Sequence, residues 1–183
     1  YFSEAGAKNY GLALERQGFD VYTGGIDAYS TLGWFDDSLL STVISRANYQ
    51  LAGLIFHELA HQVAYLPGNT TFNESFATAV EREGLRRWLG ATEQSETIAI
   101  AERNSSRREQ FINLVSRFRD RFESVYQDEI SETQKRQEKS ALQDQLRAEY
   151  EQLKASWNDY IGYDAWFSRS LNNAQLSTVS SYN

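Results

Sequence analysis

Apolar spacing between about residue 91 and residue 157 constrains the fold of this chain more than any other feature. In both halves of this stretch, apolar side chains recur at intervals of three and four, which places them on one face of an α-helix. The residues that define the spacing are Phe111, Leu114, Val115, Phe118, Phe122 and Val125, then Leu142, Leu146, Tyr150, Leu153 and Trp157. The pattern breaks near residues 127–131, where Ser131 can cap a second helix. The sequence therefore predicts an antiparallel helical hairpin over residues 91–157.

Arginines are frequent in the first arm of this predicted hairpin, where they could form an anion site. They are Arg103, Arg107, Arg108, Arg117, Arg119 and Arg121. Acidic residues are mixed among them along the chain, which favours a solvated helix face over an anion site.

The composition is that of a folded globular chain. Of the 183 residues, 41% are hydrophobic and one is a proline, so we expect a single, mainly helical domain over residues 1–183. Acidic residues outnumber basic residues by 25 to 18, and the net charge of −7 would repel a polyanion, which argues against a nucleic-acid partner. The absence of cysteine excludes disulfides and thiolate metal sites. No apolar run is long enough to cross a bilayer.

Residues 18–36 carry the strongest signal for β-structure. Adjacent glycines lie there between β-branched and aromatic residues, and glycine readily adopts the positive φ of a tight turn, so a β-hairpin is predicted. A short helix is expected before the hairpin, over residues 1–17, and another after it, capped by Asp36 or Asp37.

The most apolar predicted helix covers residues 48–66. Its apolar side chains lie on nearly all sides, so we expect this helix to be buried. Pro67 and Gly68 end it, because proline cannot continue a helix and glycine favours a turn. Asn73 is then expected to cap a second helix, so that residues 48–89 form a helix pair.

The two histidines of the chain, His57 and His61, lie four positions apart on the first of these helices, with Glu58 next to His57. Residues at i and i+4 share a helix face, so both imidazoles can bind one ion, and imidazole nitrogens suit zinc. Glu58 can reach a water molecule on that ion and take its proton, as in the HExxH motif of metallopeptidases. The alternative is a pair of structural histidines. It is disfavoured because a buried helix would then carry an unpaired Glu58 carboxylate.

A hydrolytic zinc site needs a third protein ligand. With no further histidine and no cysteine in the chain, that ligand must be a carboxylate. Glu74 and Glu81 are the nearest candidates, both on the predicted second helix. Glu74, in the first turn, is placed to face the histidines. Glu81, two turns further along the same face, is placed to accept a hydrogen bond from a ligand imidazole. The alternative for either residue is an ordinary surface glutamate.

The stretch "HELAHQVAYLPGNTTFNESFATAVE" (57–81) resembles the two-helix zinc site of the gluzincin metallopeptidases. The wider pattern, including "AYSTLGWFDDSLLST" and "GYDAWF", resembles a bacterial family of predicted aminopeptidases. The resemblance implies that His57, His61 and Glu74 bind Zn²⁺ and that Glu58 is the general base. It also implies a mainly helical α+β fold of the zincin type, with a small β-hairpin or edge strand and a long helical hairpin. In such a fold residues 26–35 would be the sheet edge that pairs with an extended peptide, and the alternative is that they form an internal strand. The chain departs from the better-known zinc aminopeptidases in a shorter gap between His61 and Glu74 and in lacking their glycine-rich upstream motif.

These features predict zinc-dependent hydrolysis with a peptide as the substrate. The resemblance implies an aminopeptidase. A tyrosine of the C-terminal segment 158–183 is a candidate to stabilise the negative charge that develops on the substrate carbonyl. The candidates are Tyr160, Tyr163 and Tyr182, of which Tyr163 is selected. Two alternatives stay open. One is a metal-stabilised interaction module without catalysis that uses residues 91–157, and the other is a zinc hydrolase of non-peptide amides or esters.

Localisation follows only from the resemblance, which implies the bacterial cell envelope or periplasm. The chain contains no methionine, so it is expected to be a processed piece of a longer precursor. The resemblance implies that the segment before Tyr1 carries a lipid anchor, which would tether the precursor to a membrane.

Overall fold

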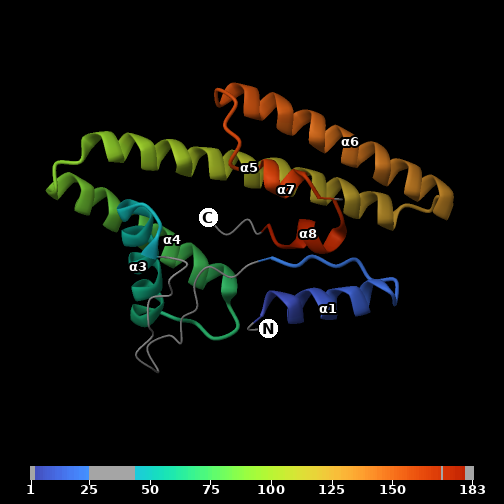
Figure 1. Cartoon of the computed structure of the whole chain (residues 1–183), viewed down its shortest axis with the longest axis horizontal. Helices are drawn as coiled ribbons and strands as arrows, with labels where there is room; N and C mark the ends of the chain where they lie inside the picture. The colour runs from blue at the N-terminus through green and yellow to red at the C-terminus, as the bar shows by residue number, and fades with distance from the viewer. Residues whose placement is uncertain (1–2, 25–43, 170, 180–183) are drawn as a thin grey trace. The chain divides into compact units, whose positions relative to one another are not determined.

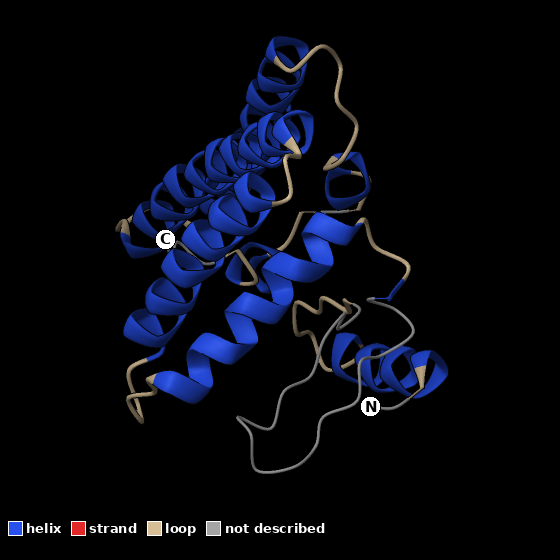
Figure 2. Ribbon diagram, turned by 90° about the vertical axis from the view of Figure 1, so that its left-hand side faces the viewer, coloured by secondary structure: helices blue, strands red, loops and turns tan. Residues whose placement is uncertain are grey.

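A computed structural model of the chain describes residues 3–24, 44–169 and 171–179. Every regular element in these ranges is an α-helix (Figure 2). In chain order the helices are α1 (Glu4–Glu15), α3 (Asn48–Val63), α4 (Thr70–Ala91), α5 (Ser95–Gln127), α6 (Glu132–Ser156), α7 (Asp164–Phe167) and α8 (Asn173–Ser177), as labelled in Figure 1. The described part of the protein is therefore all-α. None of its helices combines the length and the apolar character that a membrane span requires.

The predicted α+β fold of the zincin type is wrong, because the described ranges contain no β-strand. The short helix expected over residues 1–17 is confirmed as α1, which Ser3 caps by accepting a hydrogen bond from the Gly6 N–H at 3.1 Å. Of the predicted β-hairpin, residues 18–24 are described and form no strand. The edge strand predicted over 26–35 and the helix expected after it lie outside the described residues.

A physical reason for the missing strand lies in the backbone carbonyls that follow α1. The Val21 carbonyl accepts a hydrogen bond from Asn172 Nδ2 at 2.8 Å, and the Thr23 carbonyl accepts one from Arg169 Nη1 at 2.8 Å. These side chains satisfy the carbonyl groups that a neighbouring strand would otherwise pair with. Both donors come from the C-terminal segment, far away in the sequence, so local turn signals could not reveal them.

The chain divides into two compact units. Unit 1 comprises residues 1–24 and 106–181, and unit 2 comprises residues 25–105 and 182–183. Helix α5 contributes its first turns to unit 2 and the rest to unit 1. The expectation of a single domain stays a prediction.

Unit 1 is built around the predicted helical hairpin, which is confirmed as α5 and α6. The two helices run side by side in opposite directions (Figure 1): Arg117 on α5 pairs with Glu149 on α6, and Arg121, one turn later, pairs with Gln145, one turn earlier. Ser131 caps α6 as predicted, since its hydroxyl accepts from the Gln134 N–H at 3.3 Å. The apolar residues that predicted the hairpin form its core. Of the apolar residues that define the spacing, Leu153 is partly buried and all the others are buried.

The interpretation of the α5 arginines as a solvated face is wrong at two positions. Arg107 donates to the Trp157 carbonyl at 3.1 Å, and Arg119 donates to the Val179 carbonyl at 3.0 Å. Both guanidinium groups therefore tie the hairpin to the chain that follows it. Sequence spacing could not reveal this, because the accepting carbonyls lie 50 and 60 residues away.

Unit 2 contains the helix pair α3 and α4. Glycine permits their close approach: a Cβ atom at Gly84 would lie 2.9–3.1 Å from ring atoms of Phe56. Helix α3 packs on α4 along one side only, and its opposite side leaves Ile55, Leu59 and Val63 with 37%, 48% and 80% of their surface exposed. The expectation that α3 would be buried on nearly all sides is therefore wrong for the described structure.

Candidate metal centre

Helix α3 presents both histidines on one face. His57 and His61 are separated by one turn, and their ring centroids lie 5.0 Å apart with the rings nearly perpendicular. His61 is 8% exposed, whereas His57 is half-buried. The i, i+4 spacing accounts for this arrangement, because it places successive side chains one above the other along the helix.

A tight turn then brings α4 back against α3. The turn passes through Gly68, whose φ of +79° suits glycine and strains other residues. Asn69 caps α4, since its side chain accepts a hydrogen bond from the Phe72 N–H at 3.0 Å. The prediction that Asn73 is the N-cap is wrong, because Asn69 begins the helix four residues earlier. Asn73 lies inside α4 and is buried, with 2% of its surface exposed.

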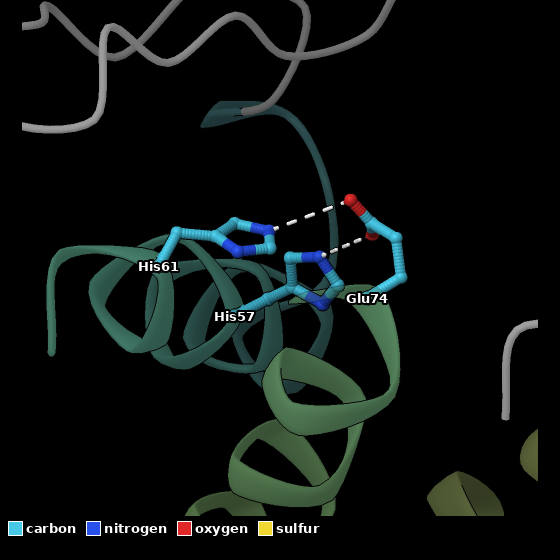
Figure 3. Close-up of side chains that lie close together, drawn as sticks. All are labelled: His57, His61 and Glu74. Atoms are coloured by element: carbon cyan, nitrogen blue, oxygen red, sulfur yellow. Dashed lines mark ion pairs between the residues drawn. The ribbon is translucent and has the colours of Figure 1, made fainter. Parts of the chain in front are cut away.

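Glu74, in the second turn of α4, faces both histidines (Figure 3). Its Oε2 atom lies 3.3 Å from His57 Nε2, and its Oε1 atom lies 3.7 Å from His61 Nε2. The possible ligand atoms of these three residues all lie within 4.8 Å of one another. The structure thus brings together the three side chains that the sequence analysis selected as metal ligands.

The donor set could hold a tetrahedrally coordinated metal ion. Ligand bonds of roughly 2.0–2.2 Å at tetrahedral angles separate the ligand atoms of such an ion by about 3.4 Å. The separations of 3.3 and 3.7 Å between the imidazole nitrogens and the Glu74 oxygens are close to this value. Two imidazoles and one carboxylate are also the protein ligands of one common class of hydrolytic zinc site, which keeps a further position open. The group could therefore hold a metal ion.

Glu81, further along α4, holds the other nitrogen of His57. Its Oε2 atom lies 3.1 Å from His57 Nδ1. A carboxylate accepts hydrogen bonds, so this contact favours the neutral tautomer with its proton on Nδ1, in which Nε2 faces Glu74 and is free to bind an ion. The hydrogen bond to Glu81 is the main reason that the pKa of His57 is raised. Burial opposes this shift, and the charges of Glu81, Glu74 and Glu58 add to it.

Glu58 is half-buried on α3, and its charge reaches His57 strongly enough to contribute to that raised pKa. Among the described residues, the group of possible ligands consists of His57, His61 and Glu74 and does not include Glu58. Glu58 therefore lies beside the group without belonging to it, which is where a proton acceptor for a neighbouring water molecule would be needed.

Over its whole length, residues 1–183, the chain matches the family described as "Putative aminopeptidase". The chain belongs to this family. No curated protein and no solved structure matches it. The family description indicates peptide hydrolysis and a peptide substrate. The resemblance drawn from the sequence predicted the same activity and the same kind of substrate. The gluzincin type and the bacterial origin stay predictions.

Tyr163 lies in unit 1 of this aminopeptidase-family chain, not in the helix pair that carries the histidines. Its ring stacks on Phe111 with centroids 4.2 Å apart, and the two planes are nearly parallel. Burial is the main reason that the pKa of Tyr163 is raised. Packing in the core of unit 1 accounts for this side chain, and a role in stabilising a substrate oxyanion stays a prediction.

Sequence reasoning missed two residues that shape the site. A Cβ atom at Gly53 would lie 3.3 Å from Glu81 Oε1, so the absence of a side chain there leaves room for this carboxylate. Tyr65 lies edge-on to the His61 ring, with centroids 6.3 Å apart. The spacing of four between His61 and Tyr65 was a visible signal, but α3 ends at Val63 and the helix rule alone did not establish the contact.

Proposed function

We propose that this chain is a zinc-dependent aminopeptidase. The observation that carries the proposal is the convergence of His57, His61 and Glu74 in a member of an aminopeptidase family. Zinc is favoured over other ions because two imidazoles and one carboxylate suit it, and the separations between their ligand atoms match its tetrahedral geometry.

When bound, zinc lowers the pKa of a water molecule and polarises the peptide carbonyl. Glu58 supplies the base that removes the proton from the attacking water and then delivers it to the leaving amine. Glu81 keeps His57 in the tautomer whose Nε2 is free to bind, through its contact of 3.1 Å with Nδ1. Proton transfer and ligand orientation are thus assigned to different carboxylates.

Substitution of Glu58 tests this assignment. We expect Glu58→Gln to keep zinc affinity and to lower kcat by about 10²–10⁴-fold, the usual contribution of a general base. His57→Ala should lose zinc and activity together. Glu83→Gln is the matched control, because Glu83 lies on α4 with its carboxylate paired to Arg86 and Arg87. Equal peptidase activity in the wild type and in Glu58→Gln would exclude the mechanism.

The aminopeptidase assignment needs a separate experiment. The zinc-loaded chain is incubated with a library of peptides, and the products are identified by mass spectrometry. Release of single residues from the N-terminus is the expected result. Cleavage inside the peptides would show an endopeptidase instead, and turnover of amides or esters without turnover of peptides would favour the alternative substrate class.

A further inference from the structure

The side chain of Asn73 binds both polar groups of a single backbone residue. Its Oδ1 atom accepts a hydrogen bond from the Leu66 N–H at 2.7 Å, and its Nδ2 atom donates to the Leu66 carbonyl at 3.0 Å. The Leu66 carbonyl also accepts from the Asn69 N–H at 3.1 Å, which closes the turn. The amide of Asn73 therefore joins the segment that follows α3 to the first turn of α4.

Burying the Asn73 amide inside α4 costs free energy that forming the helix does not require. Asn69 already caps α4, so the hydrogen bonds of Asn73 are not needed to begin the helix. Asparagine is a poor helix former in the interior of a helix, and burying its amide is unfavourable unless both of its ends are paired. Asn73 is 2% exposed and both ends are paired, each to Leu66.

The double hydrogen bond between Asn73 and Leu66, called the Leu66 clamp below, lies close in sequence to the candidate metal ligands. Leu66 follows His61 by five residues, and Glu74 follows Asn73 directly. A fixed connection between Leu66 and Asn73 therefore limits how far the start of α4 can move away from the end of α3. The separations of 3.3 and 3.7 Å between the Glu74 carboxylate and the imidazole nitrogens depend on that placement.

We propose that Asn73 is a positioning residue, which sets the Glu74 carboxylate against His57 and His61 through its double hydrogen bond to Leu66. This inference rests on the proposed metal centre. It assigns Asn73 no contact with substrate or ion. The competing view is that Asn73 only adds stability to the turn.

Asn69 supplies a matched control for that competing view. It is the same residue type four residues earlier, at the N-cap of α4, and Asn69→Ala removes the hydrogen bond that its side chain accepts from the Phe72 N–H while leaving the Leu66 clamp in place. Substituting a helix cap typically destabilises a protein. If loss of stability near the turn were enough to disturb the centre, Asn69→Ala and Asn73→Ala would weaken metal binding alike.

The experiment measures zinc affinity by competition with a chromophoric chelator, and thermal stability by circular dichroism, for the full chain. We expect Asn73→Ala to weaken zinc binding about 10-fold or more, in the range seen when residues that orient metal ligands are removed. Asn69→Ala should lower Tm and leave zinc affinity unchanged. Cobalt loading adds a second readout, because the visible absorption of Co²⁺ reports its ligands. The spectrum should change in Asn73→Ala and stay as in the wild type in Asn69→Ala.

Asn73→Ser serves if the alanine variant does not fold, since the shorter hydroxyl cannot bond both groups of Leu66 but remains polar. Wild-type zinc affinity in a folded Asn73 variant would overturn the positioning role, and so would equal losses in the Asn69 and Asn73 variants. A wild-type chain that binds zinc and cleaves no peptide would contradict the proposed function and leave the positioning role intact. A wild-type chain that binds no zinc would overturn both.

Discussion

At the scale of single residues, His57 is the centre of the site because each of its ring nitrogens faces a different carboxylate. Glu81 Oε2 lies 3.1 Å from Nδ1, and Glu74 Oε2 lies 3.3 Å from Nε2. Both carboxylates come from α4, seven residues apart, so they lie two turns from each other along the same side of one helix. One helix therefore orients the imidazole and also supplies the third candidate ligand.

The hydrogen bond between Glu81 and His57 predicts the effect of removing Glu81. We expect Glu81→Ala to weaken zinc binding by about 10–100-fold, because His57 Nδ1 loses the partner that fixes the tautomer and the ring orientation. Isothermal titration calorimetry of the metal-free protein measures this change. Glu83→Ala is the control, since it removes a glutamate from the same helix without touching a histidine. Unchanged affinity in Glu81→Ala would show that His57 needs no such partner.

At the scale of helices, the features that could be predicted are those that depend on near neighbours in the sequence. The hairpin of α5 and α6 followed from apolar spacing, and the cap at Ser131 followed from residue type. The meeting of His57, His61 and Glu74 followed from helix periodicity and a tight turn. The cap predicted at Asn73 failed because Asn69 is an equally good cap and lies nearer to the turn. Residue type alone does not choose between two such candidates.

Two glycines of α4 test how closely the helix pair is packed. A Cβ atom at Gly84 would lie 2.9–3.1 Å from the Phe56 ring, whereas nothing lies within 4 Å of one at Gly90. We expect Gly84→Ala to lower the free energy of unfolding by roughly 1–3 kcal/mol, because the added methyl group overpacks the interface. Gly90→Ala should raise it by up to about 1 kcal/mol, because alanine is the better helix former.

Urea unfolding followed by circular dichroism measures both changes. The two substitutions add the same methyl group to the same helix, so opposite signs can only arise from the surroundings of each position. A Gly84→Ala variant as stable as Gly90→Ala would show that α3 and α4 are not in close contact at Phe56.

At the scale of the whole molecule, the family match spans residues 1–183, whereas the candidate metal centre occupies only residues 57–81 of unit 2. Unit 1 has its own apolar core, and hydrogen bonds from the hairpin hold its C-terminal segment. Arg147 on α6 donates to the carbonyls of Phe167 and Arg169. The α+β prediction failed at this scale, because the chain that follows α1 is held by the side chains of Arg169 and Asn172 and by the backbone N–H of Asn173, which donates to Asp20, instead of a neighbouring strand.

A charged contact between α6 and α7 predicts how the stability of unit 1 depends on pH. Asp164 Oδ2 lies 2.7 Å from Lys154 Nζ, and Asp164 Oδ1 accepts a hydrogen bond from the Tyr150 hydroxyl at 2.5 Å. The hydrogen bond from Lys154 is the main reason that the pKa of Asp164 is lowered, followed by the bond from Tyr150. A carboxyl group with a lowered pKa in the folded state stabilises the protein above its unfolded pKa, which is about 3.9. That stabilisation is lost as the pH falls through the lower, folded value.

We therefore expect Asp164→Asn to lower the urea midpoint of unfolding at pH 7 and to have a smaller effect at pH 3, because pH 3 lies below the unfolded pKa of about 3.9, where part of the stabilisation is already lost. Asparagine can still accept from Tyr150, so the variant isolates the charge that faces Lys154. Asp144→Asn, on the exposed side of α6, is the control and should shift the midpoint little at either pH. Because the contact is partly open to water, added salt should also reduce the effect of Asp164→Asn at pH 7. An equal loss of stability at both pH values would show that Asp164 acts through the shape of its side chain and not through its charge.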